Sequence, residues 1–205
     1  MQKLKAAIIG LTLGLALVVA SAMAVFAADT GGGASLPDLA PSKAEPWTGP
    51  SIAFGIGWAV MTAAPSGENS GLFTEGAQVS GVVAYDKQWG SLVGGVGIGY
   101  AQFFGDISDG INHDIFGYGR LGLLVTPNSL VYGRLGYGRL DTDAGSIDGW
   151  RTGGGVELRV PKSPFALDLF YELGIHDTDK LVKDVDTRSH TFGARLVFRP
   201  FQYAQ

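Results

Sequence analysis

The 205-residue sequence contains no cysteine, which excludes disulfide bonds and thiolate metal sites. Only 17% of its residues are charged and the net charge is −4, so the chain has no excess of positive charge that would predict nucleic-acid binding. Beyond residue 50 no run of about 18 apolar residues occurs that would predict a membrane-spanning helix. Glycine, in contrast, is abundant at 32 residues, and aromatic residues make up 11%. Without a triplet repeat, this combination is typical of closely packed strands and not of a low-complexity chain.

The first 27 residues have the order of a secretory signal peptide. Two lysines precede an apolar stretch at residues 6–20, and small residues follow. We predict cleavage after Ala27, with Ala24 as the alternative. An uncleaved transmembrane anchor is the competing interpretation, because residues 6–24 almost suffice to span a bilayer. The alanine-rich end and the N-terminal position favour the cleaved signal, and therefore export.

The remaining chain divides into three parts by composition. Residues 28–50 are rich in Gly, Ala, Ser and Pro and lack an apolar period, which predicts a flexible periplasmic leader. Residues 51–198 contain no further segment of this kind, so we expect one domain there. Residues 199–205 are expected to form a short tail, whose role the sequence leaves open.

Strict two-residue alternation, the signature of β-strands, begins directly after the leader. In a soluble sandwich the face opposite the large apolar residues would be charged and exposed. Here that face is small, which suits the cramped interior of a narrow barrel. The large residues are Ile52, Phe54, Ile56, Trp58 and Val60, and the small ones are Ser51, Ala53, Gly55, Gly57 and Ala59.

The pattern repeats, so we predict an all-β fold: an eight-stranded antiparallel up-and-down transmembrane β-barrel with short periplasmic turns and longer extracellular loops. An even number of strands places both barrel ends in the periplasm. A soluble lipocalin-like barrel is the structural alternative, but it requires a charged outer face that no residue series supplies. The alternating segments are residues 51–60, 78–85, 92–100, 115–123, 131–137, 156–160, 165–173 and 191–198.

The connections and the aromatic residues support this topology. Four long loops, expected at residues 62–76, 104–114, 140–149 and 177–188, hold 12 of the 19 acidic residues. Clustered carboxylates there can bridge divalent cations to lipopolysaccharide phosphates, although solubility of exposed loops explains them as well. The aromatic residues near strand ends predict membrane girdles. They are Trp47, Trp58, Trp89, Trp150, Tyr85, Tyr100 and Tyr137.

The chain resembles the opacity-like, outer-membrane immunogenic barrel family of Gram-negative bacteria, the small "porin family" proteins. The resemblance implies a fold and a location more strongly than an activity. The chain departs from the family pattern at its end: such barrels usually end on a phenylalanine, whereas here Arg199 and six further residues follow Phe198. The residues that carry the resemblance are Pro46-Trp47-Thr48-Gly49, residues 80–85 with Trp89, Gly119-Arg120-Leu121-Gly122, residues 130–138, Gly153-Gly154-Gly155-Val156-Glu157 and Tyr171-Glu172-Leu173.

Several charged residues fall on the face assigned to the barrel lumen. Charges inside a barrel must be paired or hydrated, because unpaired burial costs several kcal/mol. We therefore expect a plug of ion pairs, since eight strands enclose only enough space for side chains. A narrow polar pore is the alternative. The residues are Arg120, Arg134, Glu157, Arg159, Asp168, Glu172 and Arg195, together with Arg151.

Two histidines suggest a weaker, ligand-binding hypothesis. His176 ends the seventh strand and His190 begins the eighth, so both are expected near the outer rim, where two imidazoles suggest a metal or haem contact. The family resemblance adds some support, because it implies relatives that bind haemin. Histidines at a rim are more often simply hydrated, and this interpretation is the favoured one. Ser189-His190 does not predict a catalytic dyad, because adjacent strand residues point to opposite faces.

The sequence therefore favours a non-catalytic outer-membrane protein with a structural and surface role. We expect it to contact outer-membrane lipids and lipopolysaccharide with its barrel and an extracellular partner with its loops. A narrow pore, or a barrel that binds haem or another small ligand, is the alternative. No catalytic residue, metal site or cofactor is predicted.

Overall fold

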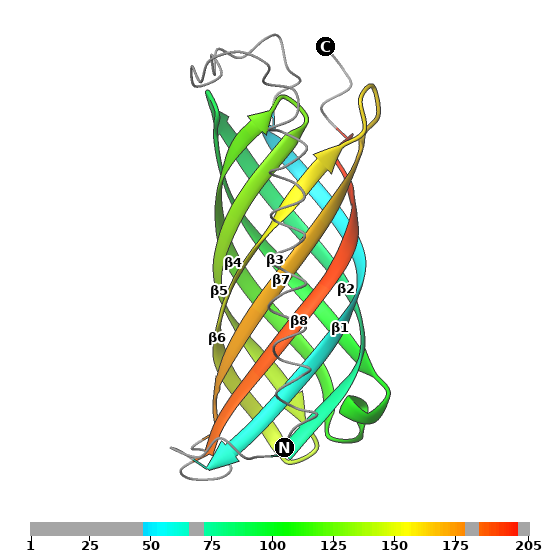
Figure 1. Cartoon of the computed structure of the whole chain (residues 1–205), viewed down its shortest axis with the longest axis vertical. Helices are drawn as coiled ribbons and strands as arrows, with labels where there is room; N and C mark the ends of the chain where they lie inside the picture. The colour runs from blue at the N-terminus through cyan, green and yellow to red at the C-terminus, as the bar shows by residue number, and fades with distance from the viewer. Residues whose placement is uncertain (1–46, 66–71, 179–184, 201–205) are drawn as a thin grey trace, which may run out of the picture. The chain divides into compact units, whose positions relative to one another are not determined.

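In the computed structural model, which describes residues 47–65, 72–178 and 185–200, eight antiparallel strands form one closed barrel (Figure 1). Each strand pairs with its sequence neighbours, and β1 pairs with β8. The predicted closed barrel is confirmed. The elements are β1 (Gly49–Pro65), β2 (Leu72–Trp89), β3 (Leu92–Phe104), the 3₁₀ helix η1 (Asp106–Asp109), β4 (Ile111–Thr126), β5 (Ser129–Thr142), β6 (Gly145–Arg159), β7 (Phe165–Asp177) and β8 (Val185–Phe198).

The two ends of the barrel differ. The start of β1 and the end of β8 lie at one end, here called the terminal end (Figure 1). The opposite end carries η1 and the β5–β6 turn, and is here called the loop end. None of the helical residues in the described ranges forms a helix long and apolar enough to cross a membrane.

The strands extend well beyond the segments expected from alternation. Residues 140–149, predicted as a loop, form the end of β5, a two-residue turn and the start of β6. β6 likewise begins at Gly145, whereas alternation indicated a segment only from residue 156. Polar outward residues and consecutive glycines interrupt the apolar pattern there, but they leave the backbone hydrogen bonding intact. Loop lengths inferred from polarity were therefore too long.

The two faces of the sheet separate by residue size as expected. The large apolar residues of β1 point outward, and its small residues point into the barrel. Outward exposure reaches 70% for Phe54 and 69% for Ile98. The predicted girdle residues are also exposed on the outer wall, with one exception: Trp47 is fully buried.

The register sets the tilt of the strands. A path through hydrogen-bonded partners around the barrel, starting at Ala53, returns to β1 at Ala63, which is ten residues further along. With ordinary strand spacings, this stagger over eight strands corresponds to a tilt of about 42° from the barrel axis. Such a barrel has room inside for side chains and little else.

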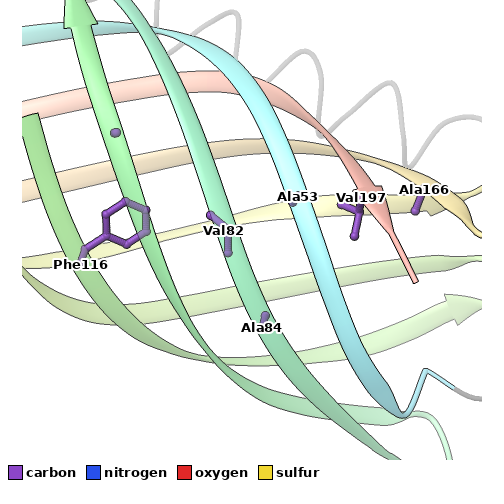
Figure 2. Packing of buried hydrophobic residues seen from close by; sticks show 7 residues of the cluster. Ala53, Val82, Ala84, Phe116, Ala166 and Val197 are labelled. Carbon is purple, nitrogen blue, oxygen red and sulfur yellow. The ribbon is translucent and has the colours of Figure 1, made fainter. Parts of the chain in front are cut away.

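Small residues on one side of the lumen make room for large ones on the other. Figure 2 shows Phe116 beside Val82 and several alanines, which form one buried apolar cluster. The absence of a side chain at Gly99 is required, because a Cβ there would lie 2.3 Å from the Phe116 ring. In the middle of the lumen, inward residues of β1 and β3 are thus small because longer side chains of β4 and β8 occupy the space beside them.

Candidate functional site: the charged lumen

The first ion cluster lies toward the terminal end and consists of Asp86, Arg120, Glu157 and Arg199. Arg120 donates hydrogen bonds of 2.7 and 2.5 Å to Asp86 and one of 2.9 Å to Glu157. Arg199 donates at 2.9 Å to Asp86 and at 2.9 and 2.8 Å to Glu157. Two guanidinium groups therefore lie between two carboxylates, and their charges cancel. Burial is almost complete, with Asp86 0%, Glu157 1% and Arg199 1% exposed.

Trp47 closes the terminal end of the lumen. The Cζ atoms of Arg159 and Arg199 each lie 5.2 Å from the centre of its ring, a cation–π arrangement. Its indole N–H donates to the carbonyl oxygen of Pro127 at 3.2 Å, and its backbone N–H donates to Gln88 at 2.7 Å. Trp47 also packs in an apolar cluster with Val93, Leu124, Leu130 and Tyr132.

The position of Trp47 corrects two expectations. It is neither part of an outer girdle nor part of a flexible leader, because its side chain is fully buried, hydrogen-bonded to Pro127 and in contact with Arg199. β1 moreover begins at Gly49, so the structured part starts before the predicted boundary at residue 51. The predicted signal peptide and the leader up to residue 46 lie outside the described residues.

The second ion cluster lies in the middle of the lumen. Asp168 accepts hydrogen bonds from the Tyr132 hydroxyl at 2.7 Å and from Arg195 at 3.2 Å. The Cζ of Arg195 lies 3.5 Å from the centre of the Phe170 ring. This buried arginine thus contacts an aromatic face and a carboxylate. The two contacts replace much of the hydration that the guanidinium group loses on burial.

A chain of ion pairs continues from there toward the loop end. Glu172 pairs with Arg134 and, at 2.9 Å, with Arg151. Arg151 also pairs with Asp114 at 2.5 Å and lies over the Phe116 ring. Within the described residues, the lumen holds six arginines and five carboxylates, so its charge is close to balanced.

Apolar side chains close the loop end of the lumen. Ile107 of η1 is 1% exposed and packs with Phe103, Leu140 and Ile147. Between the two closed ends, the cavity lined by the ion clusters has a volume of about 20 Å³. That volume suffices for one or two water molecules. Among the described residues, side chains therefore fill most of this part of the interior.

The sequence placed most of these residues correctly and missed three of them. Arg120, Arg134, Glu157, Arg159, Asp168, Glu172 and Arg195 all point inward, as does Arg151. Asp86 lies just beyond the predicted segment 78–85, Asp114 lies in the predicted loop 104–114, and Arg199 lies in the predicted tail 199–205. The two-residue alternation identifies all three, since each continues the inward series of its strand. Arg195 and Val197 of β8 point inward, for example, and Arg199 directly after β8 does so as well.

The structure does not bring His176 and His190 together. His176 is buried in the lumen, where it pairs across the sheet with Thr187. His190 lies between the exposed Arg188 and Phe192 on the outer wall, and its Nδ1 lies 2.7 Å from the Tyr171 hydroxyl. The two imidazoles therefore lie on opposite sides of the sheet. No group of three or more potential metal ligands occurs among the described residues.

His176 forms a different pair, with Ser189. Its Nε2 lies 2.9 Å from the Ser189 hydroxyl, and both side chains are buried. Its Nδ1 has no hydrogen-bond partner among the described residues, so no carboxylate orients the ring as in a catalytic triad. The pair is therefore consistent with packing of the lumen and lacks the features of a hydrolytic centre.

Comparisons with known proteins give fold neighbours only. No family model matches the chain, and no curated protein is significantly similar in sequence. Among solved structures, Neisserial surface protein A is 16% identical, with 72% of this chain and 96% of that chain covered and a TM-score of 0.44.

Two further structures are similar to the same extent. Ail, the attachment invasion locus protein of Yersinia pestis, is 19% identical, with 72% and 98% of the two chains covered and a TM-score of 0.37. A de novo designed transmembrane β-barrel is 14% identical, with 71% and 94% covered and a TM-score of 0.39. The assignment of this chain to the eight-stranded antiparallel barrels therefore depends on its own strand pairing.

Proposed function

We propose that this protein is an outer-membrane β-barrel with a structural and surface role and without catalytic activity. The carrying observation is the inversion of polarity across the sheet: arginines and carboxylates fill the lumen, while large apolar side chains cover the outer wall. Only a surrounding apolar phase makes that distribution favourable, because monomeric soluble proteins rarely expose contiguous apolar patches of this size.

The soluble alternative fits the outer wall poorly. A lipocalin-like barrel turns its large apolar residues inward to form a ligand cavity. Here Phe54, Ile56, Ile98 and Leu121 are all more than half exposed, and the interior cavity is about 20 Å³. Among the described residues, neither a buried apolar cavity of ligand size nor a charged outer surface supports that function.

The filled lumen favours anchoring over transport. Charged side chains span the interior in paired clusters, and apolar caps with Trp47 and Ile107 close its two ends. An ion that crossed the barrel would have to displace both caps and break several buried ion pairs. We therefore assign the barrel to lipid contact and the loop end to contacts outside the cell.

The proposed orientation follows from the position of the chain ends. The terminal end faces the periplasm, and the loop end faces outward toward lipopolysaccharide and external partners. Export through a signal peptide of residues 1–27, which lie outside the described residues, completes this proposal. The opacity-like family remains the prediction made from the residues quoted above.

The experiment that tests the proposal combines fractionation with heat modifiability. The full-length chain is expressed, and its outer-membrane fraction is run on a denaturing gel with and without boiling. We expect the protein in that fraction, with a mobility shift that reports a closed barrel. Recovery in the soluble periplasm contradicts the membrane assignment, and stepwise conductance of the purified barrel in a planar bilayer contradicts the sealed lumen.

A further inference from the structure

The outward face of β2 carries one charged residue at each end of its apolar part. Glu75 lies toward the loop end, and Lys87 lies at the terminal end, where the adjacent Asp86 pairs with the first residue of β1. The two charged residues are twelve positions apart, and the outward residues between them are uncharged. At about 3.3 Å per residue and a tilt of about 42°, this separation spans about 29 Å along the barrel axis, close to the thickness of the hydrocarbon layer. Lys87 therefore lies at the level of lipid headgroups.

The ring of Trp89 fixes the position of the Lys87 ammonium group. The Lys87 Nζ lies 5.6 Å from the centre of that ring, a cation–π arrangement. Gly94 of β3 pairs with Lys87 and leaves space for the ring, because a Cβ there would lie 3.0 Å from the Cζ3 of Trp89. Both Lys87 and Trp89 are exposed on the outer wall. The ammonium group therefore faces the surroundings of the barrel and not its lumen.

The outside of the terminal end is positive. Lys87 forms no ion pair with another described residue. Every carboxylate in the described ranges lies either in the lumen or at the loop end. The exposed charged residues at the terminal end, within the same ranges, are Lys87 and Lys162 of the β6–β7 turn. An ammonium group at headgroup level thus lacks a carboxylate partner from the protein itself.

This charge distribution indicates which lipid the ammonium group binds. Phosphate oxygens accept strong, charge-assisted hydrogen bonds from a lysine. A zwitterionic headgroup also brings its own amine, which Lys87 repels and for which the outer wall at this end offers no carboxylate among the described residues. An anionic headgroup brings the phosphate without that amine. In the proposed orientation the loop end meets lipopolysaccharide, so the terminal end lies in the opposite leaflet, which consists of phospholipids.

We propose that Lys87, positioned by Trp89, binds the phosphate of an anionic phospholipid in the leaflet around the terminal end, an inference that rests on the proposed membrane position and orientation. The ammonium group of Lys87 donates hydrogen bonds to the phosphate oxygens. The acyl chains of the same lipid lie along the apolar outer wall beyond Tyr85, where Val83 and Val96 are exposed on β2 and β3.

The test measures which lipids stay bound to the intact barrel. The full protein is reconstituted with equal amounts of phosphatidylglycerol and phosphatidylethanolamine and released into detergent, and native mass spectrometry counts the retained lipids. We expect wild type to retain phosphatidylglycerol over phosphatidylethanolamine by on the order of fivefold, the ratio that about 1 kcal/mol per lysine near an anionic surface gives. Lys87→Gln should remove the preference, whereas Lys87→Arg, which keeps the charge, should retain it.

Matched controls separate this site from a general attraction between charges. Lys162→Gln removes the other exposed cation of the terminal end and should retain the preference; a loss equal to that of Lys87→Gln contradicts a defined site. Trp89→Leu should lower the preference, and an unchanged ratio contradicts the positioning role of the ring. Free glycerol phosphate at the lipid concentration should not displace the bound lipid, and displacement contradicts the assignment to a membrane lipid.

The outcomes distinguish this inference from the proposed function. Equal retention of the two lipids by a wild-type barrel that still shows heat modifiability overturns the phosphate site alone. A preference for phosphatidylglycerol that persists in Lys87→Gln also overturns it, because another part of the protein then binds the anionic lipid. Absence of heat modifiability in the wild type overturns the membrane barrel and the phosphate site together.

Discussion

Arg199 follows the last strand in the sequence, yet its side chain lies between two fully buried carboxylates. It donates to Asp86 of β2 and Glu157 of β6, and it contacts the ring of Trp47. Arg120 alone cannot balance both acids, so Arg199 completes the neutrality of the first ion cluster. Loss of one member of such a buried pair leaves an uncompensated charge, which costs far more than the pair itself contributes.

We expect Arg199→Met to lower the free energy of unfolding by about 3–5 kcal/mol, because Asp86 and Glu157 lose a shared partner in a dry interior. Denaturant unfolding from lipid vesicles measures the change. Arg139→Met is the matched control: Arg139 pairs with Asp148 at 3.0 Å on the outer wall, where it is exposed to solvent. A similar loss for both variants contradicts the role given to Arg199.

Residue parity explains what the sequence could reveal about the lumen and what it could not. Alternation alone assigns Arg134 and Glu172 to one face, and both lie there. Alternation does not reveal that Arg134 and Glu172 pair with each other. Their strands, β5 and β7, are not neighbours, so the pairing depends on the tilt of the strands and on the length of the two side chains. Trp47 was misplaced for another reason: a tryptophan near a strand end fits a girdle and a cap equally.

At the level of the strand, β6 is unusual for its three consecutive glycines, Gly153 to Gly155. A Cβ on Gly153 would lie 2.2 Å from the carbonyl oxygen of Tyr171 on β7, and a Cβ on Gly155 would lie 2.7 Å from the hydroxyl of Tyr132. The first contact is with backbone, which cannot move without disturbing the β6–β7 pairing. Glycine at these two positions therefore permits the close approach of β7 and of the Tyr132 side chain to the backbone of β6.

Replacing glycine by alanine within a strand ordinarily stabilises it by roughly 1 kcal/mol. At Gly153 the steric clash should outweigh this gain, so we expect Gly153→Ala to destabilise the barrel. Gly117→Ala is the control, because a Cβ at that position has its nearest neighbour 3.9 Å away. Comparison of the two variants by the temperature at which the unboiled gel form disappears tests this. A more stable Gly153→Ala barrel would show that the strands separate freely at this point.

Strand boundaries were predicted less well than strand existence, and β5 and β6 show why. The apolar pattern marks only the part of a strand that meets the apolar phase. Beyond it, Asp141 and Ser146 remain paired across the hairpin although their sequence resembles a loop. Backbone hydrogen bonds sustain the sheet there, and hydropathy does not report them.

At the scale of the whole barrel, the outer wall should behave differently with depth in a bilayer. Ile98 and Gln102 lie on the same outward face of β3, but Ile98 is within the apolar belt and Gln102 is at its edge. We expect Ile98→Arg to destabilise the barrel in a bilayer by about 2–4 kcal/mol and Gln102→Arg by about 1 kcal/mol or less. Unfolding from lipid vesicles measures both, and equal effects contradict the depth assigned to the belt.

The closure of β1 on β8 has a consequence for how the barrel assembles. Asp86 and Glu157 belong to earlier strands, whereas Arg199 arrives with the last one. A chain whose seam is still open therefore leaves Asp86 and Glu157 without the guanidinium group that bridges them, and water must stay there to solvate these carboxylates. Dehydration of the interior and joining of the first and last strands are then a single event, so no dry intermediate precedes the closed barrel.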